Sequence, residues 1–225
     1  MRFISLTLVS LLMLPLVTGC EAPPPEQRVK TARQNSTPTL GRHFGKPVFI
    51  RIIKEDYEFE LYVQEPDHSW QLVKTYEIAG MSGDIGPKTR EGDEQAPEGF
   101  YRVLPGAMNP RSNYHLSFNI GYPNAYDRAL GRTGSYIMVH GSDVSIGCFA
   151  MTDPGIEEIY TLVNEAFKAG VKSVPVQIYP FRMTKERMAE EAFSEHHEFW
   201  QHLLPGWEYT EQHGAPYDDS DSRLD

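Results

Sequence analysis

The feature that most constrains the fold is a succession of short β-type segments between residues 47 and 180, separated by turns and broken by one well-signalled helix. These runs, rich in Val, Ile, Tyr and Phe, are Val48–Ile53, Tyr57–Val63, Trp70–Ala79, Phe100–Leu104, Tyr136–Val139 and Val174–Tyr179. Polar–apolar alternation through Phe59, Leu61 and Val63 indicates strands with one buried face. The pattern therefore predicts a mainly β domain.

Two helices are expected around these strands. The first has Asp153 as its N-cap, Pro154 in its first turn and Gly170 at its end, with an apolar face that should pack on the sheet. The second, a C-terminal helix from about Thr184 to Leu204, is expected to stop at Pro205 and Gly206.

The beginning of the chain has the pattern of an exported protein. Residues 1–19 hold one charge and a long apolar run, which predicts a secretory signal peptide. The run ends in Leu-Val-Thr-Gly before Cys20, a sequence that resembles a bacterial lipoprotein box with Cys20 as the lipidated residue. The alternative is ordinary cleavage nearby, with Cys20 a bystander. The Pro-rich, polar segment 20–45 is expected to be a tether.

These boundaries give an expected mainly β domain over residues 46–180, a helical extension over 181–207 and an acidic disordered tail over 208–225. We expect the mature protein to lie in the periplasm and to contact a membrane only through a lipid anchor at Cys20.

Composition excludes several classes of protein. The chain has 21 Lys and Arg against 31 Asp and Glu, a net charge of −10, which argues against nucleic acid as a partner. Its two cysteines cannot form a disulfide-rich scaffold or a structural zinc site. The pair Glu198 and His202 has the i,i+4 spacing of metal ligands, but a solvated helix face is the expected interpretation. No metal or other cofactor is expected.

One stretch combines the residues of a thiol acyl-transfer site. His140 ends a predicted strand, and Cys148 follows a short loop that contains Gly141, Ser145 and Gly147. A cysteine thiolate is a nucleophile, and a neutral imidazole can accept its proton. The backbone N–H groups of Gly147 and Cys148 could stabilise an oxyanion. Asp143 is expected to face water rather than complete a triad. Spacing alone leaves a buried structural His–Cys pair as the alternative.

The motif His140-Gly141 followed by Ser145-x-Gly147-Cys148 resembles the signature of the L,D-transpeptidase catalytic domain family (the YkuD-type domain). Upstream, Gly86-Pro87-Lys88, Gly92-Asp93 and Ala96-Pro97-Glu98-Gly99 are similar to a second region of that family, in the expected order. The resemblance implies an L,D-transpeptidase-like β-sandwich with one helix packed on the sheet. It also implies an enzyme that attacks diaminopimelate-containing peptidoglycan stem peptides, with Cys148 as nucleophile and His140 as base, and Gly141, Ser145 and Gly147 as positioning or oxyanion residues.

The sequence departs from the usual family pattern in two ways. The loop between the histidine and the cysteine is short, and Phe149-Ala150 stands where many members have an aliphatic residue followed by Arg or Asn. The cation that would bind a substrate carboxylate is therefore open among Lys88, Arg90, Arg111 and Arg128. His115, Asn119 and Lys88 are candidate substrate-binding residues, and a satisfied strand histidine and a turn asparagine are equally compatible with the sequence.

The short-loop form resembles the YafK-like branch of the family, for which hydrolysis of peptidoglycan-linked lipoprotein is implied in place of cross-linking. The acyl acceptor therefore stays open between an amine and water. Two other functions are weighed against this one. A sortase-like thiol acyltransferase would place its histidine far upstream of the cysteine, and a non-catalytic wall-binding envelope lipoprotein would need no reactive thiol.

Overall fold

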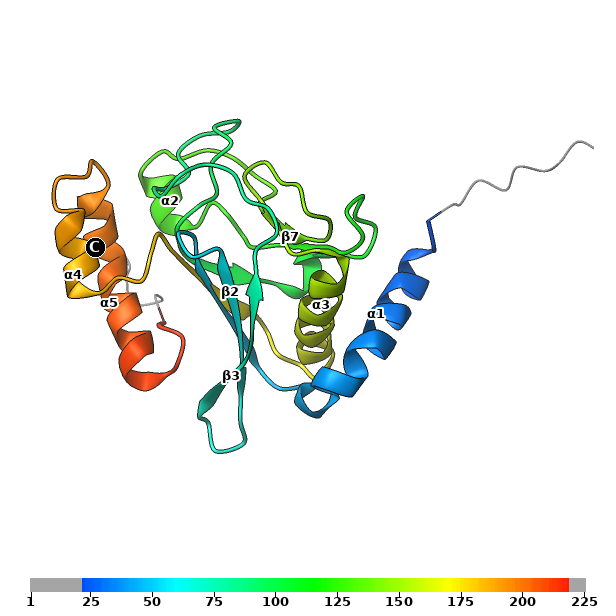
Figure 1. Ribbon diagram of the computed structural model, residues 1–225. Helices are drawn as coiled ribbons and strands as arrows, with labels where there is room; N and C mark the ends of the chain where they lie inside the picture. Colours follow the sequence, from blue (N-terminus) through cyan, green and yellow to red (C-terminus); the bar gives the residue numbers. More distant parts are fainter. Residues whose placement is uncertain (1–21, 219–225) are drawn as a thin grey trace, which may run out of the picture.

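The computed structural model describes residues 22–218 and contains two β-sheets packed with helices (Figure 1). The predicted signal peptide and Cys20 lie outside the described residues. The larger sheet has the strand order β3-β2-β1-β9-β4, and the smaller one has the order β5-β6-β7-β8. The mainly β fold class expected from the sequence is confirmed.

The larger sheet contains the strands that the sequence patterns predict. It consists of β1 (Val48–Ile53), β2 (Glu58–Gln64), β3 (Trp70–Glu77), β4 (Gly99–Val103) and β9 (Val174–Tyr179). Strand β9 pairs in parallel with β1 and antiparallel with β4, so it lies inside the sheet. The last strand of the domain, β9, is therefore hydrogen-bonded to its first strand, β1.

The smaller sheet consists of β5 (Met108–Asn109), β6 (Ser117–Asn119), β7 (Met138–His140) and β8 (Phe149–Ala150). Strands β7 and β8 are parallel. His140 lies opposite Ala150, which is two residues after Cys148. This pairing therefore brings the end of β7, at His140, close to the start of β8, which Cys148 immediately precedes.

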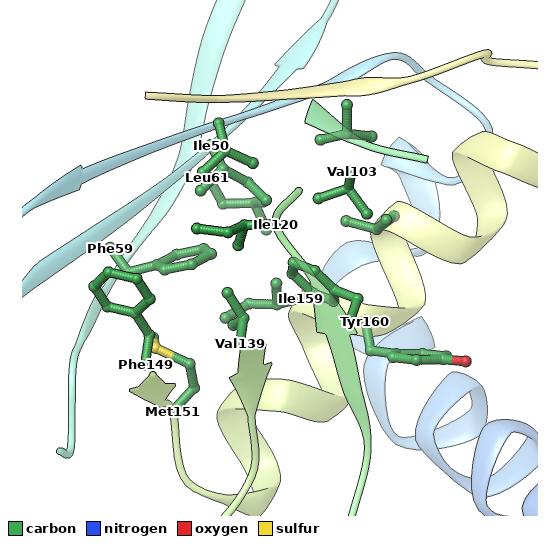
Figure 2. Packing of buried hydrophobic residues seen from close by; sticks show 14 of the residues in the cluster. Ile50, Phe59, Leu61, Val103, Ile120, Val139, Phe149, Met151, Ile159 and Tyr160 are labelled. Carbon is green, nitrogen blue, oxygen red and sulfur yellow. The ribbon is translucent and has the colours of Figure 1, made fainter. Parts of the chain in front are cut away.

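The hydrophobic core lies between the two sheets and helix α3 (Asp153–Lys168). Figure 2 shows Phe59 and Leu61 of the larger sheet facing Val139 and Phe149 of the smaller one. Ile159 and Tyr160 of α3 pack from a third side, as the predicted amphipathic face requires. The N-cap of α3 is Thr152, one residue before the predicted Asp153, and its hydroxyl accepts a hydrogen bond from Gly155 N–H.

The expectation that residues 20–45 form a solvated tether is wrong for most of that segment. Helix α1 (Pro25–Leu40) lies alongside α3 (Figure 1), and a short 3-10 turn (Gly41–His43) leads from it into the domain. Its buried side chains are Ala32, Ser36 and Leu40. So narrow a contact face produces little sequence periodicity, and the helix depends on packing against α3 rather than on its own propensity.

The C-terminal region also differs from its prediction. Two helices, α4 (Lys185–Glu190) and α5 (His197–His213), replace the single expected helix, and α5 continues through Pro205 and Gly206. Residues 208–213 are therefore helical and not part of a disordered tail.

The buried rings of Trp200 and Trp207 pack with Tyr179 and Phe181 in a second core at the opposite end of the molecule from α1 (Figure 1). Two further elements, the 3-10 turn Pro105–Ala107 and α2 (Ala125–Ala129), complete the described fold.

Candidate active site

Cys148 and His140 line one pocket because β7 and β8 run side by side. His140 is the last residue of β7, and Cys148 immediately precedes β8. The pocket has a volume of about 570 Å³. Its lining is mostly polar and aromatic, and it consists of Asn109, Arg111, Ser112, Asn113, Tyr114, Ser117, Tyr136, Met138, His140, Val144, Ser145, Ile146 and Cys148. The structure thus brings together the two residues that the sequence singles out.

The Cys148 thiol is held by backbone groups of the segment leading into β7. Its Sγ accepts a hydrogen bond from Met138 N–H at 3.3 Å and donates to the Tyr136 carbonyl at 3.6 Å. Burial raises the pKa of this thiol above its ordinary value, and the Met138 N–H and the charge of Lys88 offset part of that increase. The resting residue is therefore a protonated thiol.

His140 is held in one tautomer by the backbone. Its Nδ1 lies 2.6 Å from the Gly141 carbonyl oxygen, which can only accept, so Nδ1 carries the hydrogen and Nε2 keeps its lone pair. Burial lowers the pKa of His140, and the hydrogen bond to Gly141 opposes this effect. The ring of Tyr114 covers the imidazole at a centroid distance of 4.8 Å. A neutral imidazole with a free Nε2 is the form that a general base requires.

Within the part of the chain that the structure describes, no hydrogen bond links Cys148 directly to His140. The thiol instead points its hydrogen at Tyr136. A neutral thiol beside a neutral imidazole can react once the thiol rotates, since catalytic hydrogen bonds often form only when the substrate is bound. The geometry favours proton transfer during attack over a preformed thiolate–imidazolium pair.

The two expected oxyanion donors are already engaged. Gly147 N–H donates to the Ser82 hydroxyl at 2.6 Å, and Cys148 N–H donates to the Ser145 hydroxyl at 3.1 Å. An oxyanion would reach either N–H only after one hydroxyl turns away. Their role as oxyanion donors and the positioning role of Ser145 stay predictions.

Ser82 is a site residue that the sequence did not reveal. Its hydroxyl also donates to the Glu94 carbonyl, so it fastens the long glycine-rich loop, residues 80–99, to the segment that carries Cys148. Only its place in that loop, which is too long for an ordinary hairpin, could have pointed to it.

Gly141 is explained by a close approach of three chain segments. A Cβ atom at this position would lie 2.5 Å from Asp153 Oδ1 and 2.7 Å from the Tyr114 carbonyl. The N–H of Gly141 donates to the carbonyls of Tyr114 and Leu116. Glycine therefore allows the loop to turn sharply directly after the histidine.

The three tentative substrate-binding residues lie outside the lining of this pocket. His115 Nε2 contacts Glu157 of α3 at 2.9 Å, and Asn119 accepts a hydrogen bond from Gly121 N–H in a turn. Lys88 is buried in an ion pair with Asp93. Local partners occupy their polar atoms, which agrees with the alternative of a satisfied histidine and a turn asparagine, and substrate binding by these three residues stays a prediction.

Arg111 supplies the positive charge of the pocket. Among the residues that line this pocket, none is Asp or Glu, and Arg111 is the one Lys or Arg. In the described chain no hydrogen bond or ion pair of its guanidinium is found, whereas Arg128 donates to the Pro123 carbonyl. Phe149 and Ala150, which follow Cys148, are fully buried in β8. The pocket is therefore suited to an anionic ligand.

Comparisons with known proteins match more than half of this chain to one protein family. A family model described as the L,D-transpeptidase catalytic domain (YkuD) matches residues 51–178. Two relatives, from Escherichia coli K12 and Escherichia coli O157:H7, are each named "Putative L,D-transpeptidase YafK". Each is 48% identical over 172 residues, covering 76% of this chain and 70% of the relative.

A solved structure shows a similar fold. The crystal structure of a mutant of the helical cell shape determining protein Pgp2 from Campylobacter jejuni has a TM-score of 0.50 at 21% identity, covering 81% of this chain and 64% of that one. This chain thus spans less than two thirds of the crystallised protein.

Over residues 22–218, none of the helices combines the length and hydropathy needed to cross a bilayer.

Proposed function

Because this chain belongs to the L,D-transpeptidase catalytic domain family, we propose that it acts on diaminopimelate-containing peptidoglycan through a thioester at Cys148. The observation that carries the proposal is the shared pocket, in which a thiol lies near an imidazole whose Nε2 is free to accept a proton. Family membership favours this reaction over the sortase-like alternative.

The proposed reaction has two steps. His140 Nε2 takes the proton of the Cys148 thiol as the sulfur attacks the diaminopimelate carbonyl carbon, and the C–N bond to the leaving amine then breaks. The amine leaves with the proton that His140 held, and a thioester remains. An amine or a water molecule then attacks the thioester carbon and gives its proton to His140. The C–S bond breaks, and His140 passes this proton to the departing sulfur, which restores the Cys148 thiol and the neutral imidazole.

We propose water as the main acceptor in the second step. The loop beside Cys148 is short, and its Val144 and Ile146 side chains are 61% and 72% exposed, so this wall leaves the acceptor side open. With Phe149 and Ala150 buried, the position that carries Arg or Asn in many relatives offers nothing to hold a second stem peptide. The enzyme would then release amine-linked groups, such as the lysine of a peptidoglycan-linked lipoprotein, and form few cross-links.

The test is product analysis by mass spectrometry with two substrates. One is peptidoglycan fragments that carry a lysine-linked lipoprotein peptide, and the other is free tetrapeptide together with an amine acceptor. Release of the lysine-linked peptide without new dimers supports hydrolysis, while dominant cross-linked dimers would show transpeptidation. Cys148→Ala should abolish either product and keep the fold, and turnover by this variant would exclude the thiol mechanism.

We also propose that the protein is exported and anchored through Cys20, on the evidence of its signal-like residues 1–19 and lipobox-like sequence. Fractionation of cells that express Cys20→Ala tests the anchor. Release of the variant from membranes supports lipidation, and retention contradicts it.

A further inference from the structure

A second pocket lies beside the first, between α1 and β5. It has a volume of about 630 Å³. Its walls are Pro25, Glu26, Val29, Lys30 and Arg33 of α1, Met108 to Arg111 of the β5 turn, and Lys168 at the end of α3. Asn109 and Arg111 line both pockets. We call this second pocket the α1 groove, and it continues the candidate active site beyond Arg111.

The α1 groove is positively charged, although the protein as a whole carries a net charge of −10. Four cationic side chains line it: Lys30, Arg33, Arg111 and Lys168. Glu165 pairs with Arg33 and with Lys168, and Glu26 is the acidic residue of the lining. Among residues 22–218, no ion pair is found for the ammonium of Lys30 or the guanidinium of Arg111. The groove therefore retains positive charge that its own carboxylates do not neutralise.

The apolar part of the lining suits an extended chain rather than a small ion. Pro25, Val29, Met108 and Pro110 lie between the cationic side chains. A peptide with spaced carboxylates would place its charges on the cations and its backbone or methyl groups on this apolar surface. The helix that forms one wall lies outside the family match at residues 51–178, whereas the β5 turn and Lys168 lie inside it, so the groove joins α1 to the matched domain.

We propose that the α1 groove binds the carboxylate-bearing peptide part of the substrate whose carbonyl is attacked in the neighbouring pocket. This inference rests on the proposed function for the identity of the substrate. Arg111 would hold the carboxylate nearest the reacting carbonyl, and Lys30 would hold one farther along the peptide. The groove thus determines which peptides bind productively.

The experiment uses the full mature chain with Lys30→Glu, and with Lys185→Glu as a matched control on α4. Lys185 is an exposed lysine that lines neither pocket. Binding of a stem tetrapeptide with free carboxylates is measured by calorimetry, as is binding of the same peptide with its carboxylates outside the reacting bond converted to carboxamides. Turnover of both peptides gives KM and kcat.

We expect Lys30→Glu to weaken binding of the free-carboxylate peptide and raise its KM at least about fivefold, with a much smaller change for the carboxamide peptide. Lys185→Glu should match the wild type. Equal losses for both peptides, or no loss, would overturn the groove assignment and leave the proposed reaction intact if turnover persists. Absence of turnover together with Lys30-dependent peptide binding would reject the proposed reaction but support the groove.

An anionic lipid surface is the other source of negative charge that such a groove could meet. Vesicles of phosphatidylglycerol and of phosphatidylcholine separate the two. If Lys30→Glu reduces binding to the anionic vesicles and leaves peptide affinity unchanged, the groove is a lipid site and our assignment is wrong.

Discussion

At the residue scale, the environment of Cys148 and His140 decides how the thiol can be activated. Burial disfavours the charged form of each group, so it raises the pKa of the thiol and lowers that of the imidazole. Both groups are then neutral near pH 7. The sequence motif identifies the two residues but not this charge state, which depends on surrounding chain segments such as Tyr114 and Met138.

This charge state predicts the pH dependence of the reaction. Because the pKa of His140 is lowered, its neutral form persists to lower pH, and kcat/KM should stay constant down to a pH below about 6.5, the ordinary imidazole value. Alkylation of Cys148 by iodoacetamide should reach half its maximal rate above about pH 8.5, the ordinary thiol value. Half-maximal alkylation near pH 6 would instead indicate a preformed thiolate.

Gly141 permits a second prediction at this scale. In Gly141→Ala the new methyl group would meet Asp153 Oδ1 and the Tyr114 carbonyl, so we expect a loss of about 1–3 kcal/mol in the free energy of unfolding and a larger fractional loss of activity. Gly106→Ala is the control because nothing lies within 4 Å of its Cβ position. Urea unfolding measures both variants, and equal stabilities would contradict the crowding argument.

At the element scale, helix α1 holds a loop of the candidate active site in place. Arg28 of α1 donates from Nη1 to the carbonyls of Ser112 at 2.9 Å and His115 at 3.0 Å. The loop between these two carbonyls contains Tyr114, whose ring covers His140. The helix therefore supports His140, the proposed general base, through a loop, a connection across more than 80 residues that no local pattern predicts.

Loss of this contact should reduce activity more than it reduces stability. We expect Arg28→Ala to lower the free energy of unfolding by about 1–2 kcal/mol and kcat/KM by about tenfold, because Tyr114 would no longer be held over His140. Gln27→Ala is the control, since Gln27 contacts Thr31 of the same helix. Arg28→Lys, which keeps one donor, should restore part of the activity. Unchanged kinetics in Arg28→Ala would show that the loop holds its position without α1.

The strands and α3 could be predicted from sequence because their buried faces repeat regularly, as Phe59, Leu61 and Val63 do. Helix α1 could not, since it buries three small or medium side chains, and neither could the course of α5 beyond Gly206. A Cβ at Gly206 would lie 2.5 Å from Phe100 Cζ, so this glycine allows close packing of the helix on the sheet and does not mark a helix end.

At the scale of the whole molecule, a buried ion pair connects the sheet, the long loop and the C-terminal helices. Lys54 Nζ donates to the carbonyls of Gly86 and Ala96 and to Glu98 Oε1, and Glu98 Oε2 accepts from Trp200 Nε1 at 2.8 Å. Burial lowers the pKa of Lys54, while Glu98 favours its charged form. All of these groups are nearly inaccessible to water, so each depends on the others for its partners.

Removing one partner of this ion pair should therefore strongly reduce the free energy of unfolding. We expect Lys54→Met to lower the free energy of unfolding by about 3–5 kcal/mol, because the Glu98 carboxylate would remain buried without its ammonium partner. The double variant Lys54→Met/Glu98→Gln should lose less than the sum of the two single changes. Urea unfolding followed by tryptophan fluorescence measures the cycle, and strictly additive losses would contradict a coupled pair.

The parallel pairing of β7 and β8 has a consequence for how such enzymes diversify. Its register, Val139 with Phe149 and His140 with Ala150, is set by the core and fixes the positions on either side of the connection at residues 141–148. Residues could be inserted in the middle of that connection, between Ser142 and Ser145, without moving the strand that carries His140 or the one that follows Cys148. Evolution, or a protein engineer, could thus exchange this loop as a module while His140 and Cys148 stay where they are.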